Sequence, residues 1–330
     1  MARNIAVIGA GVIGLASAVN ILEEIPNVTV TVLADKFSPN TTSDGAAGFW
    51  EPHAAADTPE HLQRHWGEVT FRHLEALCRT EESSVAGVTT LSAYHISKEP
   101  IKDEFWASTV YNYRQVPTEE ISRQYPHAKY GIFFTSFLAE CRMYLPWLMR
   151  RFKEQGGKVV NKHVFNLEEL VGQYDVIVNC TGLHSRSLVS DDSMQPIRGQ
   201  VVRVKAPWLK HFVYDVTADC AVIPCSNNVL ITATAEIGNW NTEPDPEYRK
   251  KLWKSCCTIF PSLKHATVDY EWVGLRPGRP SVRLEKEIRK VKDEYLKIVH
   301  NYGHGGAGIT FHWGCAQDTT ALVAELLGRK

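Results

Sequence analysis

Three glycines near the start of the chain have the spacing needed to place a backbone turn against a phosphate group. Gly9, Gly11 and Gly14 form the pattern G-x-G-x-x-G within the stretch NIAVIGAGVIGLASA. In a dinucleotide-binding turn the first glycine allows the sharp bend, the second lets the backbone approach a pyrophosphate, and the third lets a helix pack closely on a strand. The helix N-terminus then directs its partial positive charge at the phosphates.

An acidic residue follows at the distance that ribose recognition requires. Asp35 ends a second apolar run, VTVTVLAD, and a carboxylate about 20 residues after the glycines accepts hydrogen bonds from a ribose hydroxyl. The flanking patterns predict strand, turn, helix and strand, which is the context that supports dinucleotide binding. The pattern alone does not separate FAD from NAD. The alternative is a structural glycine turn with Asp35 at the surface.

The composition is that of a globular protein of about two domains. The chain has 330 residues, a formal charge of −1 and 44% hydrophobic residues. This balance argues against a nucleic-acid or anionic-membrane partner, and no stretch approaches the ~18 apolar residues of a membrane span. The eight cysteines form no C-x-x-C pair and we find no signal peptide pattern, so we expect reduced intracellular thiols and no metal site.

The helices and strands that we expect around these residues indicate a mixed α/β fold. Stretches such as NIAVIG and YDVIVNC read as buried parallel strands, whereas RGQVVRVKAPW and NVLITATAEIG alternate as antiparallel strands do. Residues 58–80 and the stretch YLPWLMRRFKEQGG read as helices. We expect a discontinuous dinucleotide-binding domain built from residues 1–50, 150–190 and 290–330, and a second domain built from residues 51–149 and 191–289. A ligand site would lie between them.

The chain resembles the D-amino-acid oxidase and D-aspartate oxidase family along nearly its whole length. The resemblance rests on VIGAGVIGL, DKFSPNTTSDGAAGFWEP, YLPWL, DVIVNCTG and IGNWN, and most specifically on VGLRPGRPSVRLE and HNYGHGGAGITFHWG. It implies a Rossmann-like FAD-binding domain and a mostly antiparallel substrate-binding domain. It also implies noncovalent FAD and the oxidation of D-amino acids by O₂ to 2-oxo acids, ammonia and hydrogen peroxide.

By position, the resemblance assigns a set of residues to the cofactor. They belong to the opening turn, the loop after the second strand, the turn after YDVIVNC and the glycine-rich stretch near the end of the chain. They are Gly9, Gly11, Val12, Ile13, Gly14, Asp35, Lys36, Thr42, Ser43, Ala47, Gly48, Phe49, Val164, Thr181, Gly182, Gly303, Gly305, Gly306, Ala307, Gly308, Ile309 and Thr310.

The resemblance also assigns substrate contacts. Arg276 would pair with the substrate α-carboxylate, because a planar guanidinium binds a carboxylate through two parallel hydrogen bonds. The backbone carbonyl of Gly306 would accept from the amino group, and Tyr214 and Trp50 would lie near the substrate.

Hydride transfer from the substrate Cα to the flavin needs no acid or base, so none is nominated. His304 and His312 are expected to be structural, and so are Arg279 and Arg283.

Departures from the family pattern concern the substrate side chain. Tyr214 and Ala235 stand where D-aspartate oxidases typically have two arginines, and Ala221 stands where D-amino-acid oxidases have a tyrosine near their lid. Tyr214 either covers the substrate or is a packed aromatic. Glu51 either disfavours acidic substrates and attracts basic ones, or faces solvent.

The sequence therefore predicts a D-amino-acid oxidase of neutral or broad specificity. The alternatives are a D-aspartate oxidase that uses other cations, a non-catalytic FAD-binding protein of the same fold, and an NAD-dependent dehydrogenase, against which the second glycine turn argues. The resemblance implies a peroxisome, but the chain ends LLGRK without an S-K-L signal, so the cytoplasm stays open as a location. A homodimer is left open too.

Overall fold

The first of two sheets is almost entirely parallel. The computed structural model describes residues 2–233 and 235–329. The strand order of this six-stranded sheet is β14 (Arg283–Val291), β15 (Glu294–Tyr302), β7 (Val176–Asn179), β1 (Arg3–Ile8), β2 (Val28–Ala34) and β6 (Lys158–Asn161). Only β14 runs antiparallel to its neighbour. The unbroken apolar runs of β1, β2 and β7 suit strands that are buried on both faces.

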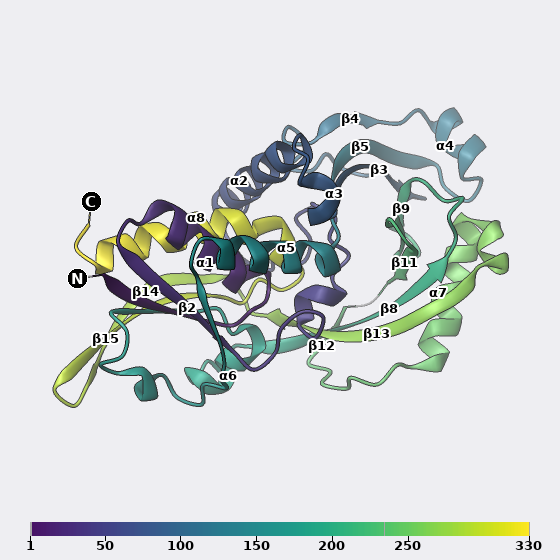
Figure 1. The fold of residues 1–330 in the computed structure, drawn as a ribbon. Helices are drawn as coiled ribbons and strands as arrows, with labels where there is room; N and C mark the ends of the chain where they lie inside the picture. Colours follow the sequence, from purple (N-terminus) through teal and green to yellow (C-terminus); the bar gives the residue numbers. More distant parts are fainter. Residues whose placement is uncertain (1, 234, 330) are drawn as a thin grey trace.

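Helices cover one face of this sheet. In Figure 1, α1 (Val12–Glu24), α5 (Cys141–Glu154) and α8 (Gly308–Leu326) lie side by side over it, and α2 (Glu60–Cys78) packs on α8. The opposite face is closed by Val164, by the short helix η2 (Leu167–Leu170) and by Leu188 of α6 (Ser185–Leu188).

The second sheet is mostly antiparallel. Its strand order is β12 (Glu236–Ile237), β8 (Gln195–Lys205), β11 (Val229–Thr232), β10 (Cys220–Pro224), β9 (Phe212–Asp215), β3 (Val88–Ser97), β5 (Tyr130–Ala139) and β4 (Tyr111–Gln115). Strand β13 (Thr267–Gly278) pairs with β8, and only β3 and β9 pair in parallel. Short helices α3 (Ser83–Ala86), α4 (Thr118–Gln124), η1 (Thr42–Gly45), η3 (Gly182–His184) and η4 (Pro261–His265) connect these elements.

Alternation along the strands separates a core face from a cavity face of the second sheet. Val202, Val213 and Val222 pack against helix α7 (Pro246–Ile259) on the outer face. Their neighbours in sequence, such as Val201 and Tyr214, line the inner cavity. Successive side chains of a strand point to opposite faces, so the period-two pattern of these stretches positions the cavity wall directly.

The structure confirms the mixed α/β class and refines several elements. Residues 58–80 form α2, and YLPWL begins inside α5, which contains Pro146. Strand β14 begins at Arg283, inside the range 191–289, and pairs with β15 of the first sheet. The domain division itself stays a prediction. All eight cysteines are free.

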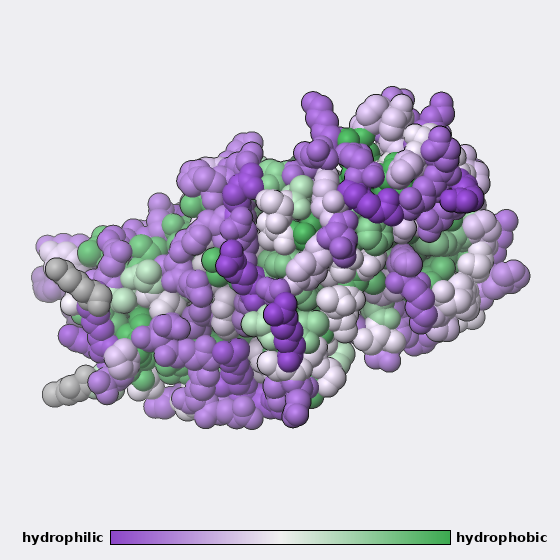
Figure 2. All heavy atoms as spheres, turned by 90° about the horizontal axis from the view of Figure 1, so that it is seen from above, coloured by the Kyte–Doolittle hydropathy of each residue, from purple (hydrophilic) through white to green (hydrophobic). Residues whose placement is uncertain are grey.

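The surface carries no sign of a large apolar patch on the face in Figure 2. Hydrophilic residues cover most of it, and hydrophobic residues lie in small separate groups. Within residues 2–233 and 235–329, no helix has the length and apolar character needed to cross a bilayer.

Candidate active site

A cavity of about 610 Å³ lies between the two sheets. Its walls include the residues that follow β1, β2 and β7, which are Gly9, Asp35 and Cys180. The inner face of the nine-stranded sheet contributes another wall. The carboxyl ends of parallel strands are the usual ligand site of such sheets, so the cavity lies where the sequence predicted it.

The opening turn is built for close backbone packing. Gly9 has φ +107°, and a Cβ there would lie 2.5 Å from the carbonyl oxygen of Cys180. A Cβ at Gly14 would overlap the carbonyl of Gly9, so this glycine seats the helix on the strand and does not line the cavity. Gly11 does line it, at the N-cap of α1, and its Cβ would meet Ser43 Oγ at 3.1 Å.

Asp35 is held at the end of β2 by a histidine that the sequence did not single out. Its Oδ2 lies 2.7 Å from Nδ1 of His163, and that hydrogen bond lowers the pKa of Asp35. Lys36, Val164 and His163 line the same part of the cavity. The carboxylate is therefore ionised and oriented where a ribose would lie.

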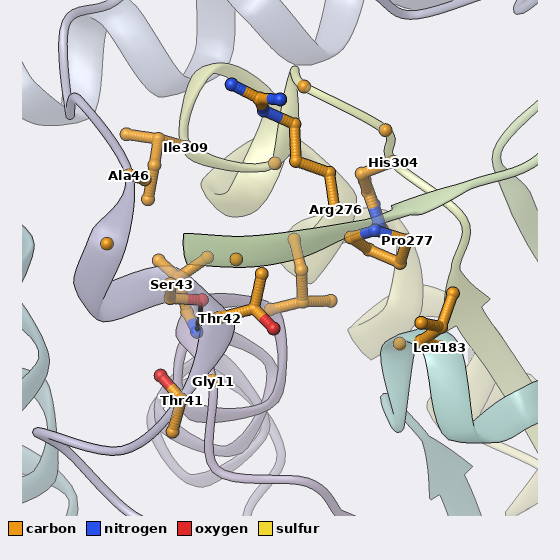
Figure 3. Close-up of a pocket in the computed structure, with 18 of the residues that line it drawn as sticks. Gly11, Thr41, Thr42, Ser43, Ala46, Leu183, Arg276, Pro277, His304 and Ile309 are labelled. Carbon is orange, nitrogen blue, oxygen red and sulfur yellow. Dashed lines mark hydrogen bonds between the residues drawn. The ribbon is translucent and has the colours of Figure 1, made fainter. Parts of the chain in front are cut away.

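The loop from residue 41 to 49 wraps the middle of the cavity. The backbone N of Thr41 donates to Asp44 Oδ2 at 2.9 Å, and Val12 N donates to Ser43 Oγ at 3.1 Å. Figure 3 shows Gly11, Thr41 and Ser43 grouped together, away from the guanidinium of Arg276. The loop residues that line the cavity are Thr41, Thr42, Ser43, Gly45, Ala46, Ala47, Gly48 and Phe49.

Arg276 projects from β13 into the cavity. Its guanidinium covers Gly199 of β8, where any Cβ would overlap it. Burial lowers the pKa of Arg276, so a cation is held here away from bulk water. A carboxylate that entered the cavity would find its natural partner at this guanidinium.

The glycine-rich turn before α8 lies beside Arg276. Gly305 N donates to the carbonyl of Pro277 at 2.9 Å, and Gly306 N donates to the carbonyl of Ala54 at 3.3 Å. Gly305, Gly306, Gly308, Ile309 and Thr310 all line the cavity. The backbone of this turn therefore faces the same space as Arg276.

The two histidines that flank the turn differ in their contacts. His312 is fully buried, with Nε2 2.8 Å from Tyr144 Oη and Nδ1 2.7 Å from the carbonyl of Ile309. This is a structural role, as predicted. His304 lines the cavity, and burial lowers its pKa to about 3. Its Nε2 makes no hydrogen bond to any described residue.

Four predicted residues do not line the cavity. Besides Gly14, these are Trp50, Gly303 and Ala307. Trp50 is a correction, because its indole is buried against Phe71 and its Nε1 donates to the carbonyl of Gly67 at 3.0 Å. Its large apolar ring belongs to the core. The flanking residues Phe49 and Glu51 face the cavity instead.

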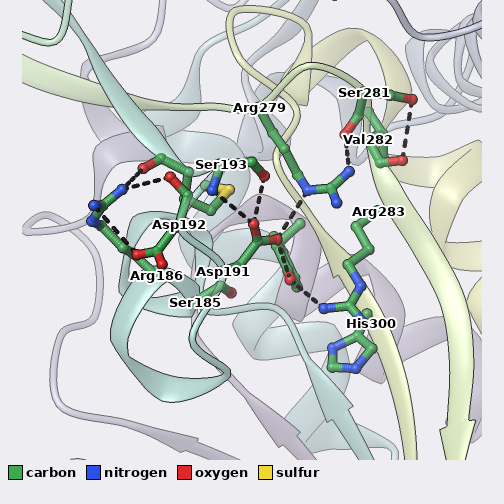
Figure 4. Close-up of polar contacts among 12 residues, drawn as sticks. Ser185, Arg186, Asp191, Asp192, Ser193, Arg279, Ser281, Val282, Arg283 and His300 are labelled. Atoms are coloured by element: carbon green, nitrogen blue, oxygen red, sulfur yellow. Dashed lines mark hydrogen bonds and ion pairs between the residues drawn. The ribbon is translucent and has the colours of Figure 1, made fainter.

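Arg279 and Arg283 do not line the cavity and belong to a polar network, in agreement with the structural role expected for them. Figure 4 shows Arg279 donating to Asp191, at 3.0 Å from Nε to Oδ2. Tyr302 Oη donates to the same oxygen at 2.7 Å and accepts from Arg283 at 2.8 Å. Burial of Asp191 opposes ionisation, but hydrogen bonds from Ser193, Tyr302 and Arg279 outweigh it and lower the pKa to about 2.

The cavity also contains residues that sequence reasoning missed. These include His53, His163, Asp219 and Trp272. They come from loops or from strands whose register a single sequence does not specify. For Asp219, the sequence gives one indication, which is the turn-forming stretch VTAD before β10.

Comparison with known proteins agrees with this geometry. A family model described as "DAO: FAD dependent oxidoreductase" matches residues 4–322. The chain is 42% identical to D-aspartate oxidase from Homo sapiens, with 97% of this chain and 94% of that protein covered. It is 39% identical to D-amino acid oxidase from Dugesia ryukyuensis, with 98% of each covered.

A solved structure shares the fold. Glycine oxidase from Bacillus cereus ATCC 14579 superposes with a TM-score of 0.77 at 18% identity, over 99% of this chain and 96% of that one. At this identity the likeness concerns the arrangement of the sheets and helices.

Proposed function

The chain belongs to the family of FAD-dependent oxidoreductases, and from that premise we propose that it catalyses the oxidative deamination of D-amino acids. The products are a 2-oxo acid, ammonia and hydrogen peroxide, and O₂ is the electron acceptor. The observation that carries the proposal is Arg276, a partly buried guanidinium in the cavity beside the glycine-rich turn. Two relatives named for the oxidation of D-amino acids support it.

The residues of the cavity fit FAD. Gly11 leaves the N-terminus of α1 open to the cavity, where a Cβ would take up space. Asp35 is ionised and oriented at one end, and the turn before α8 lies at the other. Asp35, Gly11 and the turn before α8 match the ribose, the pyrophosphate and the ring system, respectively. When bound, FAD supplies the acceptor for the hydride that leaves the substrate Cα.

The side chains and backbone of the site then have binding and orienting roles. Arg276 holds the α-carboxylate, and the carbonyl of Gly306 accepts from the amino group, so two substituents of Cα are fixed. His304 stays neutral at pH 7 because burial lowers its pKa to about 3. It therefore adds no second positive charge that would compete with Arg276.

The side-chain range in this proposal is neutral or broad. Tyr214 and Ala235 line the cavity and carry no positive charge. Oxidation of D-aspartate is the alternative, and the name of the human relative favours it. An acidic side chain would then need another cation, and Arg279 is committed to Asp191.

Anaerobic reduction of the purified holoenzyme tests the proposal. We expect a flavin absorption spectrum that bleaches on addition of a D-amino acid such as D-methionine, with peroxide formed once O₂ is admitted. The L-enantiomer should leave the spectrum unchanged. Equal bleaching by both enantiomers, or by neither across a panel of side chains, would contradict the proposal.

Assembly and location complete the proposal. A homodimer and an intracellular site, peroxisomal or cytoplasmic, remain predictions. The eight free cysteines agree with a reducing compartment. Gel filtration and fractionation of cells that express the protein would test them.

A further inference from the structure

Two carboxylates line the cavity near β9, several strands away from Arg276 along the second sheet. Glu51 and Asp219 both face the cavity. The backbone of Glu51 is fixed at the start of α8, because Thr310 Oγ1 donates to its carbonyl at 2.7 Å and accepts from its N at 3.3 Å. Asp219 lies in the turn between β9 and β10, where it is exposed at the cavity mouth.

The strand register separates these carboxylates from Arg276. Val201, Thr232, Ala221 and Tyr214 are successive cross-strand partners on β8, β11, β10 and β9. Three strand spacings of about 4.8 Å place Tyr214 on the order of 14 Å from β8. The guanidinium of Arg276 covers Gly199, on the same face of β8 as Val201. Tyr214, and Asp219 that it contacts, therefore lie three strands away from the strand that Arg276 covers, along one cavity floor.

Tyr214 and His95 connect the two carboxylates. Tyr214 Oη donates to Asp219 Oδ1 at 2.9 Å, which leaves that carboxylate with further acceptor positions. His95 faces Tyr214 with ring centroids 5.4 Å apart, and its Nε2 lies 3.4 Å from Glu51 Oε2. Tyr214 therefore belongs to a cluster with two carboxylates. The sequence by itself suggested only two roles for it, as a cover over the substrate or as a packed aromatic.

Two further observations describe the polar groups around Glu51. His95 is 4% exposed, yet its Nε2 makes no hydrogen bond to any described residue. Burial, and then the charge of Glu51, raise the pKa of Glu104, while His95 acts in the opposite direction, so a third carboxylate lies within range of the first. Among the described residues that line the cavity, the other cationic side chains are Lys36 and Lys162, which follow β2 and β6 at the Asp35 end.

We propose that Glu51 and Asp219 bind the cationic side chain of the substrate, so that the preferred substrates are long basic D-amino acids of the D-arginine and D-lysine type. This inference rests on the proposed function. Arg276 takes the α-carboxylate at one end of the floor, and the carboxylates take the guanidinium or ammonium at the other. A short neutral side chain spans too little of this floor to reach them. A D-aspartate side chain meets like charge.

Substrate kinetics of charge-removing variants test the proposal. We expect kcat/KM for D-arginine to exceed that for D-aspartate, and Glu51→Gln to lower the D-arginine value by at least about tenfold. The value for D-methionine should stay within about twofold. Asp219→Asn should act in the same direction. As a control, Glu119→Gln removes one exposed charge from α4, and it should change kcat/KM for neither D-arginine nor D-methionine.

A binding measurement separates side-chain recognition from turnover. The probes are an arginine analogue that lacks the α-amino group, and hexanoate, which keeps the carboxylate but has an uncharged alkyl chain. Titration of the holoenzyme, followed by the shift in flavin absorbance, should show the guanidinium analogue binding at least about tenfold more tightly. Glu51→Gln should remove that difference. Equal affinity for the two probes would overturn the proposal.

The two proposals fail in distinguishable ways. If no D-amino acid bleaches the flavin, the proposed function is wrong. If D-methionine bleaches it, but D-arginine is not preferred and Glu51→Gln affects both substrates equally, only the side-chain assignment is wrong. Should Glu51→Gln fold poorly, Asp219→Asn keeps the test decisive, because Asp219 lies in an exposed turn.

Discussion

Arg276 is the residue on which the proposed reaction depends most directly. Arg276→Ala should lower kcat/KM by at least about tenfold, since a charge-assisted bidentate contact contributes roughly 1.5–3 kcal/mol. The loss should be similar for every D-amino acid, because each carries the α-carboxylate. Arg276→Lys should recover only part of it, because an ammonium lacks the planar fork. Steady-state peroxide assays with D-methionine and D-arginine measure both effects.

The outcome that counts against this role is a selective one. Loss of activity toward one substrate alone would mean that Arg276 contacts a side chain. Flavin content and thermal unfolding of each variant should match the wild type, which separates the clamp from folding.

Gly11 is the residue that tests the placement of the pyrophosphate. It lines the cavity at the N-cap of α1, and a Cβ there already meets Ser43 Oγ at 3.1 Å. Gly11→Val should therefore yield folded protein without flavin, because the branched side chain occupies the space beside the helix N-terminus. The ratio of flavin to protein absorbance gives the result, and circular dichroism checks the fold. A full flavin content would show that the phosphates lie elsewhere.

Sequence alone positions single residues well where local geometry decides them. The roles of Gly9 and Gly14 follow from a turn and a close helix contact, both set by neighbours in the chain. Trp50 shows the limit. The sequence locates it beside cavity residues, but only the packing of Phe71 and Gly67 decides that its ring enters the core.

At the scale of elements, segments with strong hydrophobic periodicity could be predicted from the sequence, but strands that are defined by their pairing partners could not. Residues 58–80 and the first strands carry their own pattern. Strand β14 does not, since it alternates charges and is defined by its pairing with β15. The same holds for β9, whose parallel pairing with β3 brings Tyr214 beside His95. Long-range pairing of this kind leaves little trace in local sequence.

Three helices are joined by one buried polar chain, and this chain gives a prediction about stability. Tyr144 of α5 contacts His73 of α2 at 2.9 Å from Oη to Nε2, and His312 of α8 at 2.8 Å. Tyr144→Phe should lower the free energy of unfolding by about 1–3 kcal/mol, because two buried imidazoles lose a partner while the ring volume is kept. Denaturant unfolding of the FAD-saturated enzyme measures it.

The matched control is a tyrosine whose ring is partly in solvent. Tyr130→Phe removes a hydroxyl from a side chain that is 37% exposed, and it should change the free energy of unfolding by less than about 0.5 kcal/mol. Equal effects of the two substitutions would mean that the polar chain does not stabilise the contact among the three helices.

The whole molecule combines a cofactor sheet with a sheet that forms the cavity floor, and several imidazoles are shielded from water beside the cavity and among helices α2, α5 and α8. Burial lowers the pKa of His304 to about 3 and that of His312 to about 4, and burial also lowers the pKa of His73 well below its ordinary value of 6.5. These groups are neutral in the folded enzyme at pH 7. Any proton they take up on unfolding favours the unfolded chain.

This burial predicts how the stability of the whole enzyme depends on pH. Because the folded pKa values lie below the unfolded value of 6.5, stability is fully present above pH 6.5 and falls as the pH drops toward about 4. Each imidazole contributes a slope of about 1.4 kcal/mol per pH unit inside that window. Asp191, whose pKa is lowered to about 2, adds its loss only at lower pH. Urea unfolding at saturating FAD between pH 8 and pH 4.5 should show the decline, and His312→Gln should make it shallower; a free energy of unfolding that stays constant down to pH 4.5 would mean that these histidines are not buried as neutral groups.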